Sequence, residues 1–279
     1  HLPCAELVAR AGKHIYTEKP IAHTLENGLK LEALQKQYNV IVEVGHSARL
    51  LKGTALIKQA IDRGELGTVT FMEANFSNER ALELTPDTWR WYRDKAPGGP
   101  LSQLAIHQFN ALHYLGGEIS AVSSVASKMS PVGAEVDDQS MTLLKFQSGA
   151  IGYVGSSWTS PGIYSIRVFG QKALIHYELD FSTWDTPGEL HRSSSLYMQK
   201  IGKGYGVRED LEIPEGDMFL EELDLFADAC SQGKLENLTA YDGNIAIAVV
   251  NAALQSIENN GVLVPLDEVL EKARSAITN

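Results

Sequence analysis

The chain has 279 residues, of which 44% are hydrophobic and 21% charged, values typical of a globular protein with one or two domains. Its formal net charge of −11 argues against nucleic acid or an anionic membrane as a partner, because both attract clustered lysine and arginine. No apolar run approaches the roughly 20 residues of a membrane span, and no signal peptide is visible. Cys4 and Cys230 lie far apart, so we expect free thiols in a reducing cytoplasm.

The start of the chain alternates between helix and strand patterns. Residues 1–12 read as helical turns that end at Gly12, and residues 13–17 read as a short strand. Thr24 predicts the N-cap of a helix over residues 25–38, and a second apolar strand over residues 40–44 closes at Gly45. This order predicts part of a parallel α/β unit.

The pattern changes beyond residue 47 toward an open sheet. A helix over residues 50–63 precedes a strand over 68–77, a long loop over 78–100 and an apolar helix over 101–115. Short strands separated by glycines then indicate an antiparallel sheet. They are expected at residues 119–129, 138–146, 150–157, 164–169 and 173–179. Residues 180–214 look irregular, and helices are expected at 216–232, 240–260 and 267–277.

The tripeptide Glu18-Lys19-Pro20 follows the first strand directly. The carboxyl edge of a parallel sheet is where such folds bind ligands, and Pro20 fixes the backbone that aims the lysine. A desolvated lysine at this edge can stabilise a developing oxyanion and share its proton. The competing interpretation is an ordinary surface lysine in a β–α turn.

His107 lies on the apolar helix that follows Gly98-Gly99. A lone histidine there is more often a core residue, but its place after the glycine loop also suits a general acid or base. Gln103 lies one turn earlier on the same face. It is expected to bind a substrate hydroxyl but not to remove the hydroxyl proton, because an amide is not a base. Asn110 is expected either to contact substrate and orient the imidazole, or to cap nearby backbone.

Several further side chains are candidates for cofactor contacts. His46 and Arg49 follow the second strand and are expected to line the same crevice, and Glu18 suits a ribose or backbone amides. In the long loop, Trp89-Arg90 places an aromatic ring beside a cation. The alternative is that a tryptophan pins the loop to the core while Arg90 stacks on Trp91. No His, Cys, Asp or Glu cluster has metal-ligand spacing, so no metal is expected.

Taken together, these segments resemble the Gfo/Idh/MocA oxidoreductases, the family of glucose–fructose oxidoreductase and inositol dehydrogenase. The likeness covers essentially the whole chain, and no single motif carries it. The matching segments are the AGKH helix end, Glu18-Lys19-Pro20, Val44-Gly45-His46 with Arg49, residues 64–67, Trp89-Arg90, Gly98-Gly99, Ile106-His107 and residues 146–151.

The resemblance implies an α/β protein with a partial Rossmann parallel sheet and a C-terminal α+β domain whose large open sheet is mostly antiparallel. The expected parts are residues 1–47 from the NAD(P)-binding domain, 48–265 for substrate binding and oligomerisation, and a helix over 266–279 that packs back on the Rossmann part. The resemblance assigns catalysis to Lys19 and His107, and substrate binding to these two residues together with Gln103 and Asn110. The cofactor-binding residues that it implies are Glu18, Lys19, Pro20, His46, Arg49, Trp89 and Arg90. It also leads us to expect a cis bond before Pro20.

The implied reaction is hydride transfer between NAD or NADP and a hydroxyl or carbonyl of a sugar or polyol, by a homo-oligomer joined through the open sheet. The family's glycine-rich phosphate loop is missing from the sequence. This predicts that the sequence is part of a longer protein. The family's helix often carries carboxylates where this chain has Gln103 and Asn110. Two alternatives therefore stay open: a tightly NAD-bound enzyme that uses transient oxidation for hydrolysis or epimerisation, and a non-catalytic ligand-binding regulator.

Overall fold

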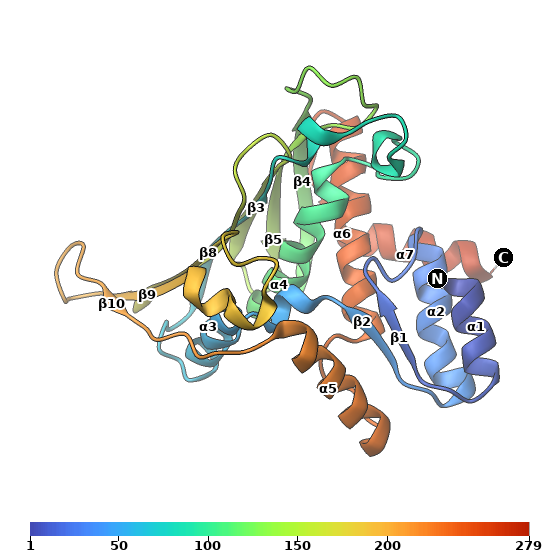
Figure 1. Ribbon diagram of the computed structural model, residues 1–279, viewed down its shortest axis with the longest axis horizontal. Helices are drawn as coiled ribbons and strands as arrows, with labels where there is room; N and C mark the ends of the chain where they lie inside the picture. Colours follow the sequence, from blue (N-terminus) through green and yellow to red (C-terminus); the bar gives the residue numbers. More distant parts are fainter. Residues whose placement is uncertain (279) are drawn as a thin grey trace.

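The computed structural model describes residues 1–278, and its first part is a small parallel α/β unit. Helix α1 (Leu2–Arg10) and strand β1 (Ile15–Glu18) are followed by α2 (Leu25–Tyr38) and β2 (Val42–Gly45). The two strands pair in parallel, with Glu18 opposite Gly45, so their carboxyl ends form one edge. Figure 1 shows this unit in blue beside the larger sheet. The predicted alternation of helix and strand is confirmed.

Local sequence signals set the boundaries of this unit. Thr24 accepts a hydrogen bond from the backbone N–H of Asn27 at 3.2 Å, as the N-cap prediction requires. At the other end of α2, Asn39 adopts the left-handed conformation with φ of 54° and stops the helix. The Lys19–Pro20 peptide bond is cis, as expected.

The larger unit is built on a nine-stranded sheet in which β3 lies near the centre. The strand order is β10-β9-β8-β7-β3-β6-β5-β4-β11, and all pairs are antiparallel except β3 with β6. The strands are β3 (Val69–Ser77), β4 (Ile119–Ser127), β5 (Gln139–Phe146), β6 (Ile151–Ser157), β7 (Ile163–Gly170), β8 (Ala173–Asp180), β9 (Ser194–Lys200), β10 (Glu209–Asp210) and β11 (Val264–Pro265). The expected fold class is therefore confirmed.

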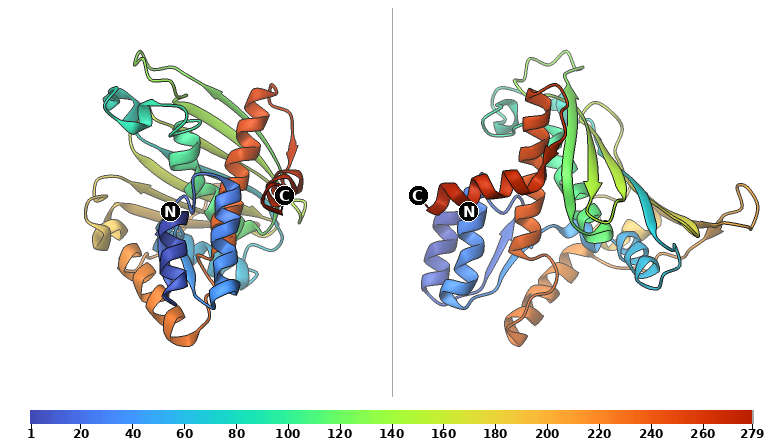
Figure 2. Two further views of the ribbon diagram at one scale, coloured as in Figure 1. Left: turned by 90° about the vertical axis from the view of Figure 1, so that its right-hand side faces the viewer. Right: turned by 180° about the vertical axis from the view of Figure 1, so that it is seen from behind.

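Four helices pack against this sheet, namely α3 (Lys52–Asp62), α4 (Ile106–Gly116), α6 (Ala240–Glu258) and α7 (Leu266–Thr278). A further helix, α5 (Met218–Gln232), packs against residues 47–50 and 187–193 and projects away from the sheet (Figure 1). Helix α6 packs against β4 and α4 of the large unit and also against β2 and α2 of the small one. Helix α7 packs against α2, α6 and β4. Figure 2 shows α6 and α7 on one side of the sheet.

The other face of the sheet carries exposed apolar side chains. Along β5 the burial alternates, with Thr142 and Leu144 buried and Met141 and Leu143 more than half exposed. Period-two alternation is the mark of a sheet with one face toward the core. Within the described residues 1–278, no helix is both long and apolar enough to cross a membrane.

The prediction of an irregular segment over residues 180–214 is wrong in part. A short 3₁₀ segment, η5 (Pro187–Ser193), leads into β9, which pairs along its length with β8. Only Leu196 and Met198 of β9 face the core, and serines occupy its start. Two apolar residues among polar neighbours give too weak an alternation to predict a strand.

Candidate active site

Lys19 is the first residue beyond β1, and its side chain reaches across to the larger unit. Its Nζ donates a hydrogen bond to the backbone carbonyl of Gln103 at 3.0 Å. Burial lowers the pKa of Lys19 to about 8, Glu18 raises it, and Arg90 and Arg80 lower it further. Lys19 therefore exchanges its proton near neutral pH, which an ordinary surface lysine does not do.

Lys19 lines a cleft of about 190 Å³ between the two units. The other polar side chains in this cleft belong to Asn78, Arg80, Arg90, Gln103 and His107. The structure therefore brings four of the predicted site residues, Lys19, Arg90, Gln103 and His107, into one cavity.

A π-helical turn, η4 (Leu101–Ala105), positions Gln103 and leads into α4, which starts one residue before His107. The sequence predicted one continuous helix here, because π-turns leave no distinct apolar period. Gly98 and Gly99 precede it with φ of 70° and 53°. A Cβ at Gly99 would meet the backbone oxygen of Asp137 at 2.1 Å, so the loop that starts this turn needs glycine there.

His107 sits half-buried among apolar and cationic neighbours. Its ring centroid lies 5.6 Å from that of Phe76 and 6.1 Å from that of His46. Burial lowers the pKa of His107 well below its ordinary value, and Lys19 and His46 lower it further. Its Nδ1 is buried without a hydrogen-bond partner among residues 1–278. His107 is therefore a neutral imidazole that can accept a hydrogen bond.

An aromatic wall completes the cleft, and the sequence analysis did not predict the rings of Phe76, Phe181 and Trp184 in it. Phe181 and Trp184 stack with ring centroids 4.6 Å apart, and Phe76 lies 5.8 Å and 5.9 Å from them. Trp158 also lines the cleft and is fully buried. Phe181 and Trp184 fall in the segment predicted to be irregular, where only the density of aromatic residues could have drawn attention to them.

Arg49 and Asn110 do not reach the cleft, contrary to their expected roles in cofactor and substrate binding. Arg49 is 3% exposed, and its Nε donates to Oδ1 of Asn110 at 2.8 Å. Its other nitrogens bond Asn237 at 2.9 Å and Asp242 at 3.0 Å. These contacts bury the guanidinium inside the protein, so Arg49 connects the turn after β2 to α4 and α6.

The remaining candidates lie around the cleft in different ways. His46 is buried against His107, and burial lowers its pKa to about 3. Glu18 is exposed and accepts a hydrogen bond from the backbone N–H of Lys19 at 3.0 Å. Arg90 stacks on Trp89, with its guanidinium carbon 4.2 Å from the ring centroid, rather than on Trp91.

A second, smaller hollow of about 60 Å³ adjoins the carboxyl edge of β1. Pro20, Ala22 and His23 line it, and Gln103 is shared with the cleft. Among residues 1–278 no group of three or more His, Cys, Asp or Glu side chains is placed to hold a metal ion.

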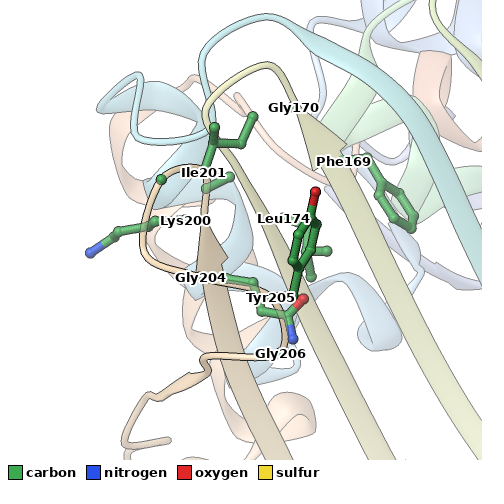
Figure 3. A pocket seen from close by; sticks show the side chains of 11 residues that line it. Phe169, Gly170, Leu174, Lys200, Ile201, Gly204, Tyr205 and Gly206 are labelled. Carbon is green, nitrogen blue, oxygen red and sulfur yellow. The ribbon is translucent and has the colours of Figure 1, made fainter.

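A larger hollow, of about 580 Å³, lies elsewhere. Figure 3 shows Phe169, Leu174 and Tyr205 around it, between the ends of β7 to β9 and the loop after Lys200. None of its lining residues also lines the cleft that holds Lys19. Its lining includes Lys200, Gln199 and Tyr205 among glycines and apolar side chains, and it contains no histidine or carboxylate.

Comparisons with known proteins agree with this arrangement. The GFO/IDH/MocA C-terminal domain family matches residues 54–176. A levoglucosan dehydrogenase from Pseudarthrobacter phenanthrenivorans is 30% identical over 185 residues, which are 58% of this chain and 47% of that protein. A scyllo-inositol 2-dehydrogenase (NAD(+)) from Bacillus subtilis is 29% identical over 265 residues, 93% of this chain and 72% of that protein.

The fold has a well-matched counterpart among solved structures. A protein from Desulfitobacterium hafniense, provisionally assigned as an NADPH-dependent oxidoreductase, superposes with a TM-score of 0.91 at 34% identity. The match covers 96% of this chain and 77% of that one. The chain therefore belongs to the Gfo/Idh/MocA oxidoreductase family. It spans about half the length of the levoglucosan dehydrogenase and about three quarters of the other two proteins.

Proposed function

We propose that the protein is an NAD(P)-dependent oxidoreductase that transfers a hydride between a nicotinamide cofactor and a hydroxyl or carbonyl of a sugar, polyol or related small molecule. The observation that carries this proposal is the meeting of Lys19 and His107 in one cleft at the carboxyl edge of a parallel strand. The relatives support it, since they include dehydrogenases named for levoglucosan, inositol and xylose.

The residues at the end of β1 fit a nicotinamide cofactor. Pro20, Ala22 and His23 provide a mostly apolar wall beside the cleft, and the exposed Glu18 carboxylate suits a ribose hydroxyl. We expect these residues to hold the nicotinamide end. The cofactor, when bound, supplies the hydride acceptor or donor.

Lys19 carries the proton chemistry, and His107 orients the substrate. With a pKa near 8, Lys19 is present in both protonation states around neutral pH. Its ammonium form donates to the reacting oxygen and stabilises negative charge there, and its neutral form accepts the hydroxyl proton. The neutral imidazole of His107 accepts a hydrogen bond from the substrate and orients the hydroxyl. Gln103 can bind a neighbouring hydroxyl through its amide.

We also propose a cytoplasmic location and a homo-oligomer. Both cysteines are free, which suits a reducing compartment. The exposed face of the large sheet carries apolar side chains from adjacent strands, namely Val125, Met141, Leu143 and Ile151. A second copy covering this face would remove that apolar surface from water.

The substitution Lys19→Met tests the proposed reaction, with the exposed Lys13→Met as its control. We expect the Lys19 variant to fold normally and to lose turnover about 10²–10⁴-fold, because it keeps the side chain's length without its proton or charge. Nicotinamide absorbance reports turnover, and thermal unfolding reports the fold. Near-normal turnover would contradict the role of Lys19. Product analysis without an added acceptor distinguishes net oxidation from transient oxidation, and ligand binding without turnover would favour a regulator.

A further inference from the structure

We propose that two copies of the protein pair about a two-fold axis, and that an arm of each copy, residues 201–208, lies on the apolar half of the other copy's sheet. The inference rests on the homo-oligomer proposed above and adds the symmetry, the receiving surface and the segment that holds the copies together. It is independent of the chemistry assigned to Lys19, because no residue of the arm lines that cleft.

The arm is the loop that joins β9 to β10 at one edge of the large sheet. Figure 1 and the right-hand view of Figure 2 show it projecting from that edge. Every residue of the arm is exposed, including the apolar side chains of Ile201, Tyr205 and Val207. Exposed apolar side chains that lie together mark a surface for binding another protein.

The base of the arm is held by contacts on both of its strands. Nζ of Lys200 lies 2.7 Å from a carboxylate oxygen of Glu209, across the hairpin. The guanidinium carbon of Arg208 lies 4.3 Å from the ring centroid of Tyr197 on β9. Two of the arm's flanking cations are thereby engaged at its base, and the apolar side chains are left at its tip.

The arm bends toward the outer face of the sheet, the face on which Met141 and Leu143 lie. Tyr205 lines the hollow of about 580 Å³ together with Phe169 and Leu174 (Figure 3). These two residues lie opposite each other on β7 and β8, and the alternation of burial along both strands places them on the outer face. A protein that packs on the outer face would therefore also meet the arm.

The outer face has an apolar half and a polar half. Strands β4 to β6 present side chains that are more than half exposed, namely Val125, Met141, Leu143 and Ile151. Toward β9 the face is polar instead. Arg167 donates to Glu73 at 3.1 Å, and Nδ1 of His176 lies 3.1 Å from the hydroxyl of Tyr197. The apolar tip of the arm thus belongs to the polar half, and the matching apolar surface lies at the far edge.

The strand order shows how a second copy brings the two together. Strand β3 is the middle strand of the nine, with β9 and β10 toward one edge and β4 and β11 at the other. A two-fold axis parallel to β3, between two outer faces, places the β9–β10 edge of each copy over the β4 edge of the other. Both arms then lie on apolar halves, and each contact is made twice.

The area of the face agrees with a dimer that needs the arm. The seven long strands β3 to β9 cover roughly 30 by 25 Å, or about 750 Å². A stable interface takes about 800 Å² from each partner, so the face alone is barely sufficient. Stacked sheets lie about 10 Å apart, and an arm that doubles back after about four residues reaches about 13 Å, enough to touch the other sheet.

The first experiment shortens the arm and measures association of the complete protein by sedimentation equilibrium. Asn-Gly replaces residues 201–206, because the pairing of Glu209 with Met198 puts Val207 opposite Lys200, where a two-residue turn fits. We expect the parent to be a dimer and the shortened variant to have a dimer Kd raised about ten-fold or more.

Point variants separate the arm from the face that receives it. Tyr205→Ser should raise the dimer Kd in the same direction as the shortened arm, and Leu143→Asp should raise it about ten-fold or more by placing a charge in the interface. The matched control is Leu82, which is as exposed as Leu143 and lies outside the arm and the sheet. Leu82→Ser and Leu82→Asp should leave the Kd unchanged.

A cross-link locates the tip of the arm on the other copy. Tyr205 is replaced by a photoreactive benzophenone amino acid, and equal amounts of ¹⁵N-labelled and unlabelled protein are mixed before irradiation. We expect mixed-isotope cross-links from position 205 to peptides of β4 to β6, residues 119–157. Circular dichroism and thermal unfolding confirm that each variant is folded.

Each contrary outcome has a definite meaning. A folded parent that stays monomeric up to about 100 μM overturns the inference together with the proposed homo-oligomer. A dimer that Leu143→Asp weakens and the arm variants do not overturns the role of the arm. Cross-links within one chain only, or to β7–β9 of the other copy, overturn the two-fold arrangement.

Turnover distinguishes these outcomes from failure of the proposed function. Nicotinamide-dependent turnover per chain should stay within about two-fold of the parent in the arm variants, because the arm lies outside the cleft. A parent without turnover under either NAD or NADP would contradict the proposed function and leave the dimer standing.

Discussion

Replacing Asp242 with asparagine tests whether Arg49 is a structural residue. The Arg49 side chain is 2% exposed, and the Asp242 carboxylate lies 3.0 Å from its Nη2. Removing one partner of a buried ion pair costs about 3–5 kcal/mol, because the other charge remains buried without compensation. The amide oxygens of Asn110 and Asn237 still bind the guanidinium, so the lower end of this range applies.

Asp242 has a second role that adds to the effect. Its Oδ2 accepts the backbone N–H of Thr239 at 2.9 Å and completes the capping box at the start of α6. Asparagine has one oxygen and cannot serve both Arg49 and Thr239 in the same way, which adds about 1 kcal/mol. The variant should therefore lose about 4 kcal/mol, a large share of the roughly 5–15 kcal/mol that stabilises a typical domain.

The pH dependence of the same variant provides an independent check. Burial would raise the pKa of Asp242, but Arg49 and the hydrogen bonds from Thr239 outweigh it and leave the pKa below the ordinary value of 3.8. A depressed carboxyl pKa stabilises the folded state above the unfolded pKa, and this stability is lost as the pH falls through the folded pKa. The acid-induced loss of stability below pH 4 should therefore be shallower in the asparagine variant.

Urea unfolding followed by tryptophan fluorescence measures these effects. The control Glu236→Gln removes an exposed carboxylate that pairs with Lys234, and it should change stability by less than about 0.5 kcal/mol. Combining Asp242→Asn with Arg49→Met should restore part of the loss, because the buried charge is gone. A stability loss below about 1 kcal/mol, together with a large drop in NADH affinity, would refute the structural role and return Arg49 to the cofactor.

Three further predictions concern pH and the aromatic wall. Burial lowers the pKa of Lys19 to about 8, so kcat/KM for alcohol oxidation should rise through pH 8 and kcat/KM for carbonyl reduction should fall. Profiles of kcat/KM against pH in both directions measure this, and profiles that are flat around pH 8 would contradict the prediction. Burial and Glu222 raise the pKa of Glu43 to about 8, above its unfolded value, so stability should fall as the pH rises from about 5 toward 8. Glu43→Gln should reduce this fall, since only the raised pKa of Glu222 then remains. The variant should be more stable than the parent at pH 8 by about 1–2 kcal/mol in urea unfolding, and an unchanged slope would contradict the prediction. Trp184→Ala should raise KM for ring-shaped substrates about 3–10-fold with little change in NADH affinity, whereas Tyr205→Ala, an exposed aromatic outside the cleft, should leave both constants unchanged.

The parts of the fold predicted from sequence are those in which a local signal determines the structure. Thr24 and the apolar spacing after it define α2 to the residue, and Glu18-Lys19-Pro20 marks the end of β1. Lys19 could be placed at the ligand-binding edge of the sheet, because it directly follows the end of a parallel strand. The strand β9 was missed because its polar residues depend on pairing with β8, which no local pattern shows.

The candidate site was only half predictable for a related reason. Lys19, Gln103 and His107 follow recognisable turns or helix positions, but Arg80, Phe181 and Trp184 reach the cleft through the arrangement of β3 and β8. Arg49 shows the opposite case. It follows a strand end, as a ligand-binding residue would, but Asn110 and Asp242 enclose it. Sequence position gives the edge of the sheet, whereas packing decides whether a side chain faces the cleft or the core.

The buried network around Arg49 also connects stability to chemistry. Asn110 belongs to α4, the helix that carries His107, and Arg49 follows β2, which pairs with the strand that ends before Lys19. The guanidinium therefore fixes the helix that carries His107 relative to the sheet strand that ends before Lys19. Small displacements of such residues lower rates strongly, because transfer requires close alignment. A weakened Arg49–Asp242 pair should consequently reduce kcat more than substrate affinity, even under conditions where the variant remains folded.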